Sequence, residues 1–396
     1  MKLIHKSYKY RLYPNVKQKI LLAKHFGACR FVYNRYLNER KEAYLEDKTS
    51  LNYYDNANSL TLIKKQDDLV WLKEINSQSL QHSLRHLDIA YNKFFNKLSQ
   101  FPTFKKRTNH QSFTVPQFFK IENGKLYIPK FKSGIEINMH NSIEGKMLFV
   151  TISKTPTNKY YVSITCEVNY EPYTKTGSAV GIDTGIKDLA ILSNGKIYEN
   201  IKPLKRKIKQ LKFKQKQLSK KVKSSNAKSK QRFLVAKHHE KVSNTRKDYL
   251  HKVTTDIIKN HDIICIEDLA VKNMVKNHKL AQSLSDVSIG MFYTMLEYKA
   301  KWNDKTIVKI DRFFPSSKTC NNCNYINQSL TLAIRQWQCP CCNEMLDRDL
   351  NASKNILKQG LKILSVLGTN SDIKQKRVEA FSLEKSMKLE ASTPLG

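Results

Sequence analysis

Residues 319–352 read TCNNCNYINQSLTLAIRQWQCPCCNEMLDRDLNA, and this stretch decides how the second half of the chain is organised. It holds two CxxC pairs, Cys320 with Cys323 and Cys339 with Cys342, separated by 15 residues. Four thiolates at this spacing are the ligands of a zinc ribbon, in which two knuckles close around one tetrahedral ion. We predict one structural Zn²⁺, because four protein ligands leave no open position for a substrate. Whether Cys341 contributes to the metal stays open.

Three acidic residues stand out in a chain with 70 Lys and Arg residues. Asp183 and Glu267 each end a short apolar run, and Asp349 directly follows the cysteine-rich stretch. Each alone has an ordinary explanation, such as a turn cap, an ion pair with a lysine or a helix N-cap. Together, acids at two strand ends and one helix start are the hard oxygen ligands that two Mg²⁺ ions need for phosphodiester hydrolysis. We therefore predict that these three residues are catalytic and bind Mg²⁺.

Around these acids, the hydrophobic pattern predicts an α/β domain. Apolar runs predict strands at 180–183, 189–192, 263–267 and 307–310, and longer periodic stretches predict helices at 204–222, 228–259, 286–303 and 350–365. The last helix places Asp349 on the same face as Ala352 and Ile356, toward the sheet. Residues 368–396 are polar, and we expect a mobile tail there.

The first half of the chain has a different pattern. Residues 3–12 alternate between apolar and basic side chains, which predicts a half-exposed strand. Helices follow up to about residue 47 and from 78 to 98, and short strands are predicted at 113–115, 126–128, 147–152 and 160–165. The simplest interpretation is a small antiparallel barrel that the first strand completes, with a helical domain inserted into it.

The net charge of +36 over 396 residues indicates a polyanionic partner, because self-repulsion on this scale opposes compaction. Between Lys202 and Lys247 the only acid is Glu240, so this predicted helical hairpin lacks the ion pairs that neutralise a solvated face. We expect it to lie against a phosphate backbone, although a merely solvated hairpin stays the alternative. No apolar stretch is long enough to span a bilayer and no export signal is visible, so we expect no membrane partner and a cytoplasmic protein with reduced cysteines. The net charge suggests association with the nucleoid.

The segments GIDTG at 181–185, IEDL at 266–269 and DRDLNAS at 347–353, with the ribbon between the last two, resemble TnpB, the transposon-encoded RNA-guided nucleases related to type V CRISPR effectors. The N-terminal YKYRLYP and the later FPTFKK extend the resemblance over nearly the whole chain. Asp183, Glu267 and Asp349 match the family's three RuvC acids. In its D-x-N-A pattern the acid lies two residues before Asn, which selects Asp349 over Asp347. The four cysteines match its zinc ligands.

The resemblance implies a multidomain α+β fold. Its layout would be a WED-like β-barrel at 1–12 and 104–175, a helical recognition domain at 13–103, a RuvC-like, RNase H-like domain at 176–317 and 344–367, a zinc ribbon at 318–343 and a flexible tail at 368–396. It also implies a guide RNA from the transposon end, a short flanking motif read by protein, and cleavage of double-stranded DNA by a monomeric protein in a ribonucleoprotein.

Two other functions are compatible with the sequence. A guide-directed repressor could keep the fold and not cut, although the three intact acids argue against it. A transposase would join strands without a guide. For the flanking motif, one helix face carries Gln78, Gln81 and Arg85, and Lys105 with Lys106 could hold phosphates; the alternative is that these residues only cover a solvated surface.

Overall fold

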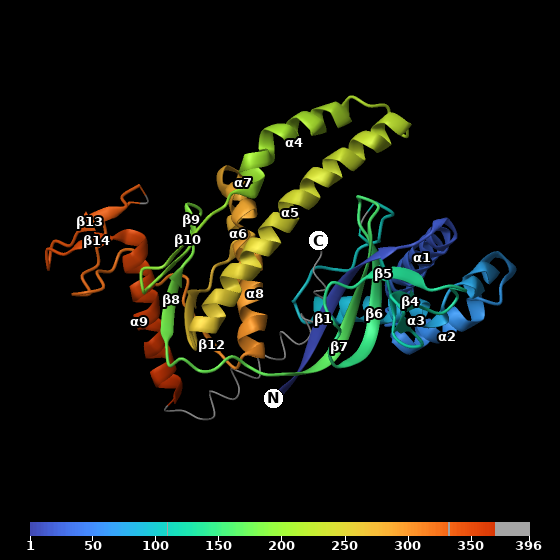
Figure 1. The fold of residues 1–396 in the computed structure, drawn as a ribbon, viewed down its shortest axis with the longest axis horizontal. Helices are drawn as coiled ribbons and strands as arrows, with labels where there is room; N and C mark the ends of the chain where they lie inside the picture. The colour runs from blue at the N-terminus through green and yellow to red at the C-terminus, as the bar shows by residue number, and fades with distance from the viewer. Residues whose placement is uncertain (109, 332, 369–396) are drawn as a thin grey trace. The chain divides into compact units, whose positions relative to one another are not determined.

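The computed structural model describes residues 1–108, 110–331 and 333–368, so nearly all of the predicted tail lies outside it. The described chain divides into two compact units, residues 3–169 and a second unit from Tyr170 onward that also includes Met1 and Lys2 (Figure 1). Within the described ranges, no helix has the length and apolar character needed to cross a membrane.

A seven-stranded sheet forms half of the first unit. Its order is β2-β6-β7-β1-β5-β4-β3. The strands are β1 (Lys2–Tyr13), β2 (Gln111–Val115), β3 (Lys120–Glu122), β4 (Lys125–Tyr127), β5 (Ile135–Asn138), β6 (Lys146–Lys154) and β7 (Tyr160–Tyr170). The predicted first strand does join the later ones, between β7 and β5. The sheet is an open half-barrel and not a closed barrel, because its edge strands β2 and β3 are short and do not pair with each other.

The helical insert packs on this sheet. It consists of α1 (Val16–Asp47), α2 (Tyr53–Ile63), a 3-10 helix (Asp67–Glu74) and α3 (Ser77–Phe95). Asn15 starts α1 because its side chain accepts the Gln18 backbone N–H while the Gln18 side chain accepts the Asn15 N–H, a capping box. Phe113 of β2 contacts the rings of His25 and Phe26 on α1. The sequence pattern predicted α1 and α3 but not the two short helices between them.

The second unit is built on a five-stranded sheet of order β10-β9-β8-β11-β12. Its strands are β8 (Ala179–Asp183), β9 (Asp188–Leu192), β10 (Ile197–Glu199), β11 (Ile263–Glu267) and β12 (Thr306–Ile310). Strands β8, β11 and β12 are parallel, whereas β8, β9 and β10 form an antiparallel meander. All four strands predicted for this half are therefore present.

Helices cover both faces of this sheet (Figure 1). One face packs on α5 (Asn226–Asn260) and α8 (Ile289–Trp302) through a large apolar cluster, and the other packs on α9 (Arg348–Gly368). The helix predicted at 286–303 is present as α8, which begins at Ile289. The short α6 (Val271–Met274) and α7 (His278–Val287) precede it and were not predicted, and α7 and α8 are separate helices. They separate at Ser288, whose positive φ of 58° interrupts the helical backbone.

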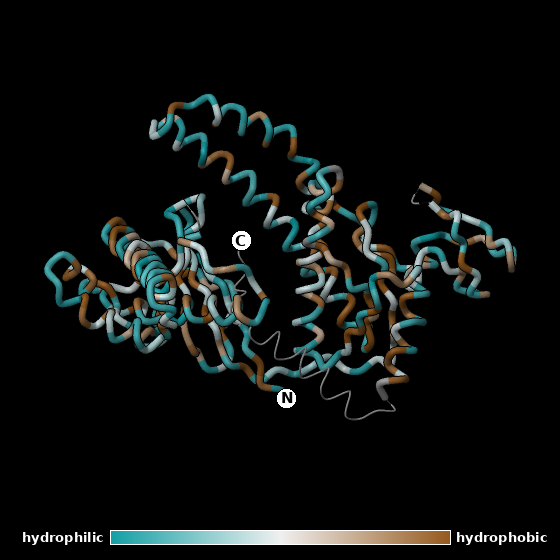
Figure 2. Tube along the Cα trace, turned by 180° about the vertical axis from the view of Figure 1, so that it is seen from behind, coloured by the Kyte–Doolittle hydropathy of each residue, from teal (hydrophilic) through white to brown (hydrophobic). Residues whose placement is uncertain are grey.

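The basic hairpin consists of α4 (Pro203–Ser219) and the first half of α5. Leu211 is buried between the helices, and the buried Gln231 donates to the Lys214 carbonyl at 2.9 Å. Along the hairpin, hydrophilic residues predominate and apolar ones are scattered (Figure 2). The basic side chains on it are mostly exposed, which fits both a surface that contacts phosphate and a solvated hairpin.

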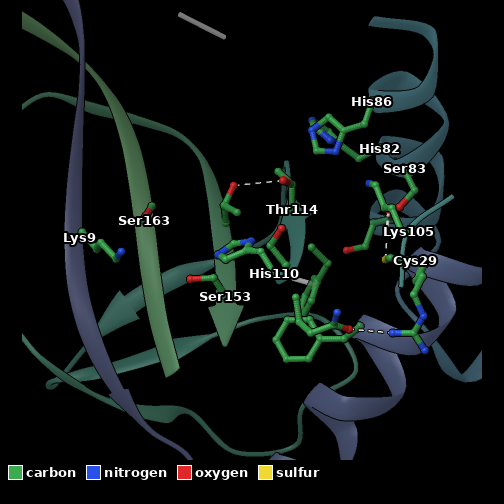
Figure 3. Close-up of a pocket in the computed structure, with 17 residues that line it drawn as sticks. Lys9, Cys29, His82, Ser83, His86, Lys105, His110, Thr114, Ser153 and Ser163 are labelled. Carbon is green, nitrogen blue, oxygen red and sulfur yellow. Dashed lines mark hydrogen bonds between the residues drawn. The ribbon is translucent and has the colours of Figure 1, made fainter. Parts of the chain in front are cut away.

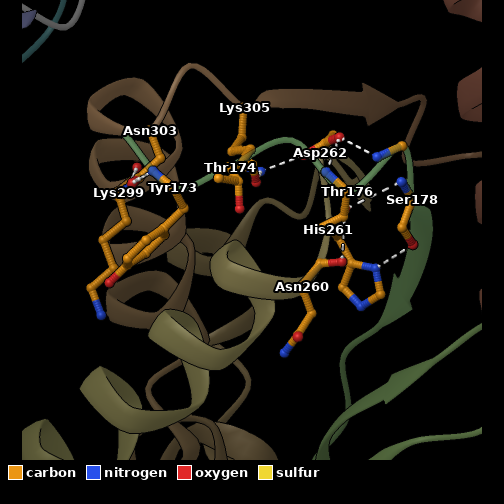
Figure 4. A network of polar contacts seen from close by, with 11 residues as sticks. Tyr173, Thr174, Thr176, Ser178, Asn260, His261, Asp262, Lys299, Asn303 and Lys305 are labelled. Carbon is orange, nitrogen blue, oxygen red and sulfur yellow. Dashed lines mark hydrogen bonds and ion pairs between the residues drawn. The ribbon is translucent and has the colours of Figure 1, made fainter. Parts of the chain in front are cut away.

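The segment that leads into the second unit is fastened to it by a polar network (Figure 4). The Asp262 carboxylate accepts the backbone N–H groups of Thr176 and Gly177 at 2.8 and 2.6 Å, and pairs with the buried ammonium of Lys305. Asn303 accepts the Tyr173 N–H at 3.0 Å. These bonds hold the chain in place just before β8, the strand that carries Asp183.

Candidate active site and metal centre

Asp183 and Glu267 lie side by side at one edge of the five-stranded sheet. Ile182 of β8 is in register with Ile266 of β11, so the next residue of each strand is one of the two acids. Strand β12 ends at the same level, because Glu267 is in register with Ile310. The carboxyl ends of these three parallel strands therefore meet at the edge predicted from the sequence.

Two glycines bring Asp349 to the same edge. Gly181 of β8 lies so close to α9 that a Cβ atom there would be 2.1 Å from the Ser353 carbonyl oxygen, and a Cβ at Gly360 would be 2.3 Å from Cys265 Sγ on β11. The helix can approach the sheet only because both side chains are absent. Asp349 lies one turn before Ser353, toward the strand ends where the other two acids are.

The electrostatics show that the three acids interact. Burial, followed by the charges of Glu267 and Asp349, raises the pKa of Asp183 to about 7. Burial also raises the pKa of Glu267. Like charges held together in a partly dry site favour protonation, and a bound cation would relieve the same repulsion. Such perturbed carboxyl groups are typical of functional sites.

Asp349 is held by two arginines that the sequence analysis did not identify. Arg335 Nη1 donates to Asp349 Oδ2 at 2.6 Å, and Arg348 donates to Oδ1 through Nε at 3.1 Å and Nη2 at 3.0 Å. The adjacency of Arg348 was visible in DRDL. No sequence signal pointed to Arg335, because it comes from the ribbon hairpin, whose strands β13 (Gln336–Gln338) and β14 (Met345–Asp347) pair next to it.

Asp347 has a different role from Asp349. Its Oδ1 accepts the backbone N–H groups of Asp349 at 3.1 Å and Leu350 at 2.9 Å, so it caps the first turn of α9. The N-cap explanation considered for Asp349 thus applies to Asp347, whereas the Asp349 carboxylate pairs with Arg335 and Arg348 and lies near enough to Asp183 for its charge to raise the pKa of that residue.

Glu267 and its neighbour Asp268 also have partners. The Ser316 hydroxyl donates to Glu267 Oε1 at 2.7 Å, and Arg312 donates to Asp268 Oδ2 at 2.6 Å. Both partners come from the loop after β12. The sequence analysis did not identify Arg312 and Ser316, because they lie more than 40 residues from Glu267 and Asp268 and no local pattern links the two segments.

The donor set suits Mg²⁺, since carboxylate oxygens are the ligands this ion prefers. Among the residues that the structure describes, however, only the four cysteines bring three or more ligand atoms within 4.8 Å of one another. The three carboxylates therefore do not all lie within that distance of one another, and each oxygen of Asp349 already accepts a hydrogen bond from an arginine.

The four predicted zinc ligands form one compact cluster. Cys320 Sγ lies 3.6 Å from Cys342 Sγ, and Cys323 Sγ lies 3.5 Å from Cys339 Sγ. Sulfurs bound tetrahedrally to zinc at about 2.3 Å would be about 3.8 Å apart, so the cluster fits a zinc ion. Cys341 is exposed and outside the cluster.

Both knuckles of the ribbon have the same backbone. In the first, the Cys320 N–H donates to the Tyr325 carbonyl, and in the second the Cys339 N–H donates to the Glu344 carbonyl. Each knuckle turns at an asparagine with positive φ, 65° at Asn324 and 58° at Asn343, a conformation that asparagine tolerates. The repeated turn explains why two sequence-distant CxxC pairs present their sulfurs alike.

A cavity of about 630 Å³ lies in the first unit between α1, α3 and the sheet (Figure 3). Its walls combine basic residues such as Lys9, Arg30 and Lys105 with several serine and threonine hydroxyls, and none of its lining residues is acidic. Burial within the cavity lowers the pKa of Lys105 to about 8. Burial, with a smaller contribution from the Arg85 charge, lowers the pKa of His82 to about 4. This chemistry suits a polar, anionic ligand.

Of the residues predicted to contact the flanking motif or the phosphates, one lines this cavity and the others do not. Lys105 lines it, but Gln78, Gln81, Arg85 and Lys106 do not. Gln78 is half-buried and donates to Gln117 Oε1 at 3.1 Å, while Gln81 is exposed. The exposed Arg85 guanidinium lies over the Tyr53 ring at 5.5 Å, and Lys106 is exposed. The cavity-lining stripe of α3 instead carries Ser79, His82, Ser83 and His86.

Family comparisons match most of the chain. A family described as "Probable transposase" matches residues 161–278, a Cas12f1-like TNB domain matches 290–356, and a "Helix-turn-helix domain" matches 1–49. In the last range the structure shows one strand and one long helix, β1 and α1.

Curated relatives match over nearly the full length. One from Streptomyces pristinaespiralis, described as a "Putative RNA-guided DNA endonuclease", is 37% identical over 91% of this chain and 90% of its own. One of the same description from Escherichia coli (strain K12) is 32% identical over 91% of this chain and 93% of its own. A solved Cas12f1–sgRNA–target DNA complex contains a chain of similar fold, with a TM-score of 0.53 at 14% identity over 89% of this chain and 98% of that one.

Proposed function

The chain belongs to the TnpB family and is an RNA-guided DNA endonuclease of transposon origin, and from this premise we propose that it cuts DNA by a RuvC-type, Mg²⁺-dependent reaction at Asp183, Glu267 and Asp349. The observation that carries the proposal is the meeting of three carboxylates at one sheet edge, where burial and mutual repulsion raise the pKa of Asp183. The strand order, with an antiparallel meander followed by two parallel strands, supports a RuvC-like assignment of this unit.

In this proposal the three carboxylates hold the metal, and Arg335 and Arg348 orient Asp349. When bound, Mg²⁺ would supply charge stabilisation at the phosphate and lower the pKa of the attacking water. Burial around Asp183 and Glu267 restricts water, which strengthens the electrostatic interactions of the site. The four-cysteine ribbon would bind structural Zn²⁺ and thereby fix Arg335 beside Asp349.

The remaining surfaces are assigned to the nucleic-acid partners. Guide RNA would specify the target by base pairing, while the α4–α5 hairpin contacts phosphates. Residues 3–169, predicted to be the WED-like barrel and helical recognition domain, would hold double-stranded DNA with its flanking motif, through the cavity around Lys105 and through Gln81 and Arg85. Residues from 176 onward would form the RuvC-like domain with its inserted ribbon at 318–343.

Cleavage assays with matched variants test the proposal. RNA that copurifies with the protein is sequenced, and guide-matched double-stranded DNA is offered to the ribonucleoprotein. Asp183→Ala, Glu267→Ala and Asp349→Ala should each lower the cleavage rate by several orders of magnitude and keep DNA binding, because they remove metal ligands and not duplex contacts. Asp347→Ala is the control: it loses a helix cap worth about 1 kcal/mol and should still cut.

The same assay separates the alternatives. A wild-type chain that binds guide-matched DNA without cutting it would be a repressor. Strand transfer of transposon ends in the absence of RNA would identify a transposase. Normal cleavage by Asp349→Ala, with loss of cleavage in Asp347→Ala, would move the third ligand to Asp347.

A further inference from the structure

Among the residues that the structure describes, the most exposed large apolar side chain after Met1 lies in the loop that follows β12. Phe313 is 85% exposed. Scattered apolar residues are common on protein surfaces, but a nearly bare aromatic ring on a well-fixed backbone beside an acidic cluster needs a reason. The neighbouring Phe314 is packed against the apolar cluster between β11, β12 and α9, so the two adjacent rings have opposite environments.

The backbone around Phe313 is rigid. The Phe313 N–H donates to Asp311 Oδ1 at 2.7 Å, and the Phe314 N–H donates to the Asp311 carbonyl at 3.2 Å. The Ser316 N–H then donates to the Phe314 carbonyl at 2.8 Å, and Pro315 limits the intervening backbone. Little backbone conformational entropy would therefore be lost when a ligand contacts the ring.

On both sides of Phe313, this loop is fastened to the residues at the end of β11. On one side, Arg312 pairs with Asp268 at 2.6 Å. On the other, the buried Ser316 donates to Glu267 at 2.7 Å. The loop also begins at the carboxyl end of β12, the sheet edge where Asp183 and Glu267 lie. Phe313 is thus bracketed by contacts to the edge at which the proposed function places the phosphodiester.

A flat, exposed ring in this position suits one ligand chemistry. Base faces in a duplex are covered by neighbouring base pairs, whereas an unpaired strand exposes them for stacking on aromatic side chains. Stacking is tolerant of base identity, as required for a nuclease whose target is chosen by a guide. A duplex groove contact would instead use hydrogen-bonding or basic side chains.

We propose that Phe313 is a substrate-positioning residue that stacks on an unpaired DNA base next to the scissile phosphate and so fixes the strand against the three acids. The inference rests on the proposed nuclease function, because it takes the phosphodiester to lie at this edge. It assigns to Phe313 a contact with single-stranded DNA, and it assigns to the loop 311–316 the task of holding the ring at a constant distance from Glu267.

Two substitutions of Phe313 distinguish an effect of the aromatic ring from an effect of apolar character alone. Phe313→Leu keeps an apolar side chain and removes the stacking face, whereas Phe313→Tyr keeps the face. In the ribonucleoprotein with copurified RNA, Phe313→Leu should lower kcat/KM for guide-matched DNA about 5- to 150-fold, the range that the loss of one stacked base produces. Phe313→Tyr should cut within about twofold of wild type, and neither change should move the unfolding temperature, since the ring is exposed.

A fluorescence measurement reports the contact without requiring cleavage. Guide-matched double-stranded DNA carries 2-aminopurine at successive positions of the strand that the guide displaces, and it is bound to ribonucleoproteins in an Asp183→Ala background. Quenching at one or two positions near the cut should be lost in Phe313→Leu and kept in Phe313→Tyr. Phe118→Leu is the control, because Phe118 is 81% exposed in the other unit, and it should leave the same reporter positions unchanged.

The results that would overturn the inference differ from those that would overturn the nuclease assignment. Wild-type cleavage by Phe313→Leu, or 2-aminopurine signals that do not respond to it at any position, would refute a stacking role while the acids stay assigned. Normal cutting by Asp183→Ala would refute the proposed active site. A loss in Phe313→Leu that Phe313→Tyr shares would show that the ring face is not what the reaction uses.

Discussion

Replacing Asp183 by asparagine should stabilise the metal-free protein and abolish its activity. Burial, then the charges of Glu267 and Asp349, raises the pKa of Asp183 from 3.8 to about 7. The folded chain therefore binds this proton more tightly than the unfolded chain does. Stability is lost as the pH rises from about 4 to 7, and the full penalty applies above pH 7. Asparagine has nearly the same shape and never ionises, so it does not incur the free-energy cost of a buried charge at this position.

The size of the effect follows from the shift. At about 1.36 kcal/mol per pKa unit, the ionised carboxylate costs about 4 kcal/mol at pH 8 and about 1.5 kcal/mol at pH 5. The Asp183→Asn chain should therefore be more stable than wild type by about 2–4 kcal/mol at pH 8, and by less than half of that at pH 5. The lower limit of about 2 kcal/mol allows for relaxation of the site around the charged carboxylate and for the different hydrogen bonding of Asp and Asn side chains.

The assay is urea unfolding of the RNA-free protein in magnesium-free buffer, with the ribbon zinc kept in place. Addition of Mg²⁺ should then stabilise wild type, because it binds only the folded site, and should have little effect on Asp183→Asn. Equal stability of the two chains at pH 8, or a gain that is the same at pH 5 and pH 8, would refute the electrostatic account. A Mg²⁺ response of equal size in both chains would show that Asp183 does not hold the metal.

Three further predictions concern the ribbon, the sheet and the flanking motif. Metal analysis should find one zinc per chain, lost in Cys320→Ser and kept in Cys341→Ser, because Cys320 belongs to the four-cysteine cluster and Cys341 does not; zinc-free wild type would contradict this. Gly181→Ala should destabilise the second unit by about 1–3 kcal/mol or more in urea unfolding, since a Cβ would be 2.1 Å from the Ser353 carbonyl oxygen; an unchanged midpoint would be inconsistent with this packing. In a randomised-motif depletion assay, Gln81→Ala should relax the flanking-motif preference by about 1–3 kcal/mol per lost base contact, whereas Lys105→Ala should weaken binding to all sequences and lower its salt dependence; an unchanged preference in Gln81→Ala would count against the assignment.

Local patterns in the sequence were enough to predict four of the five strands of the second unit's main sheet, the four cysteines that cluster and the three acids of the proposed site. These features have short-range signals: a two-residue gap between cysteines, an apolar run that ends in an acid, a helix period. The family resemblance rested on the same motifs, and the comparisons confirm it. Alternation in residues 3–12 likewise predicted a strand that pairs with the later ones.

What the local pattern could not predict depends on which segments meet. The half-barrel stays open because of how its short edge strands are placed, and the separate helices α7 and α8 depend on one backbone angle at Ser288. The cavity around Lys105 forms only where α1 and α3 pack on the sheet.

The sequence by itself therefore determined the kind of protein: its charge, its four clustered cysteines and the three acids of its proposed site. Only the tertiary structure decided that Asp347 caps a helix while Asp349 pairs with Arg335 and Arg348, and that the loop carrying Phe313 is tied to Glu267. The physical reason is the separation along the chain between the residues that interact. A cap or a metal knuckle is formed by residues a few positions apart, whereas an ion pair or a perturbed pKa depends on distances in space that no local pattern encodes.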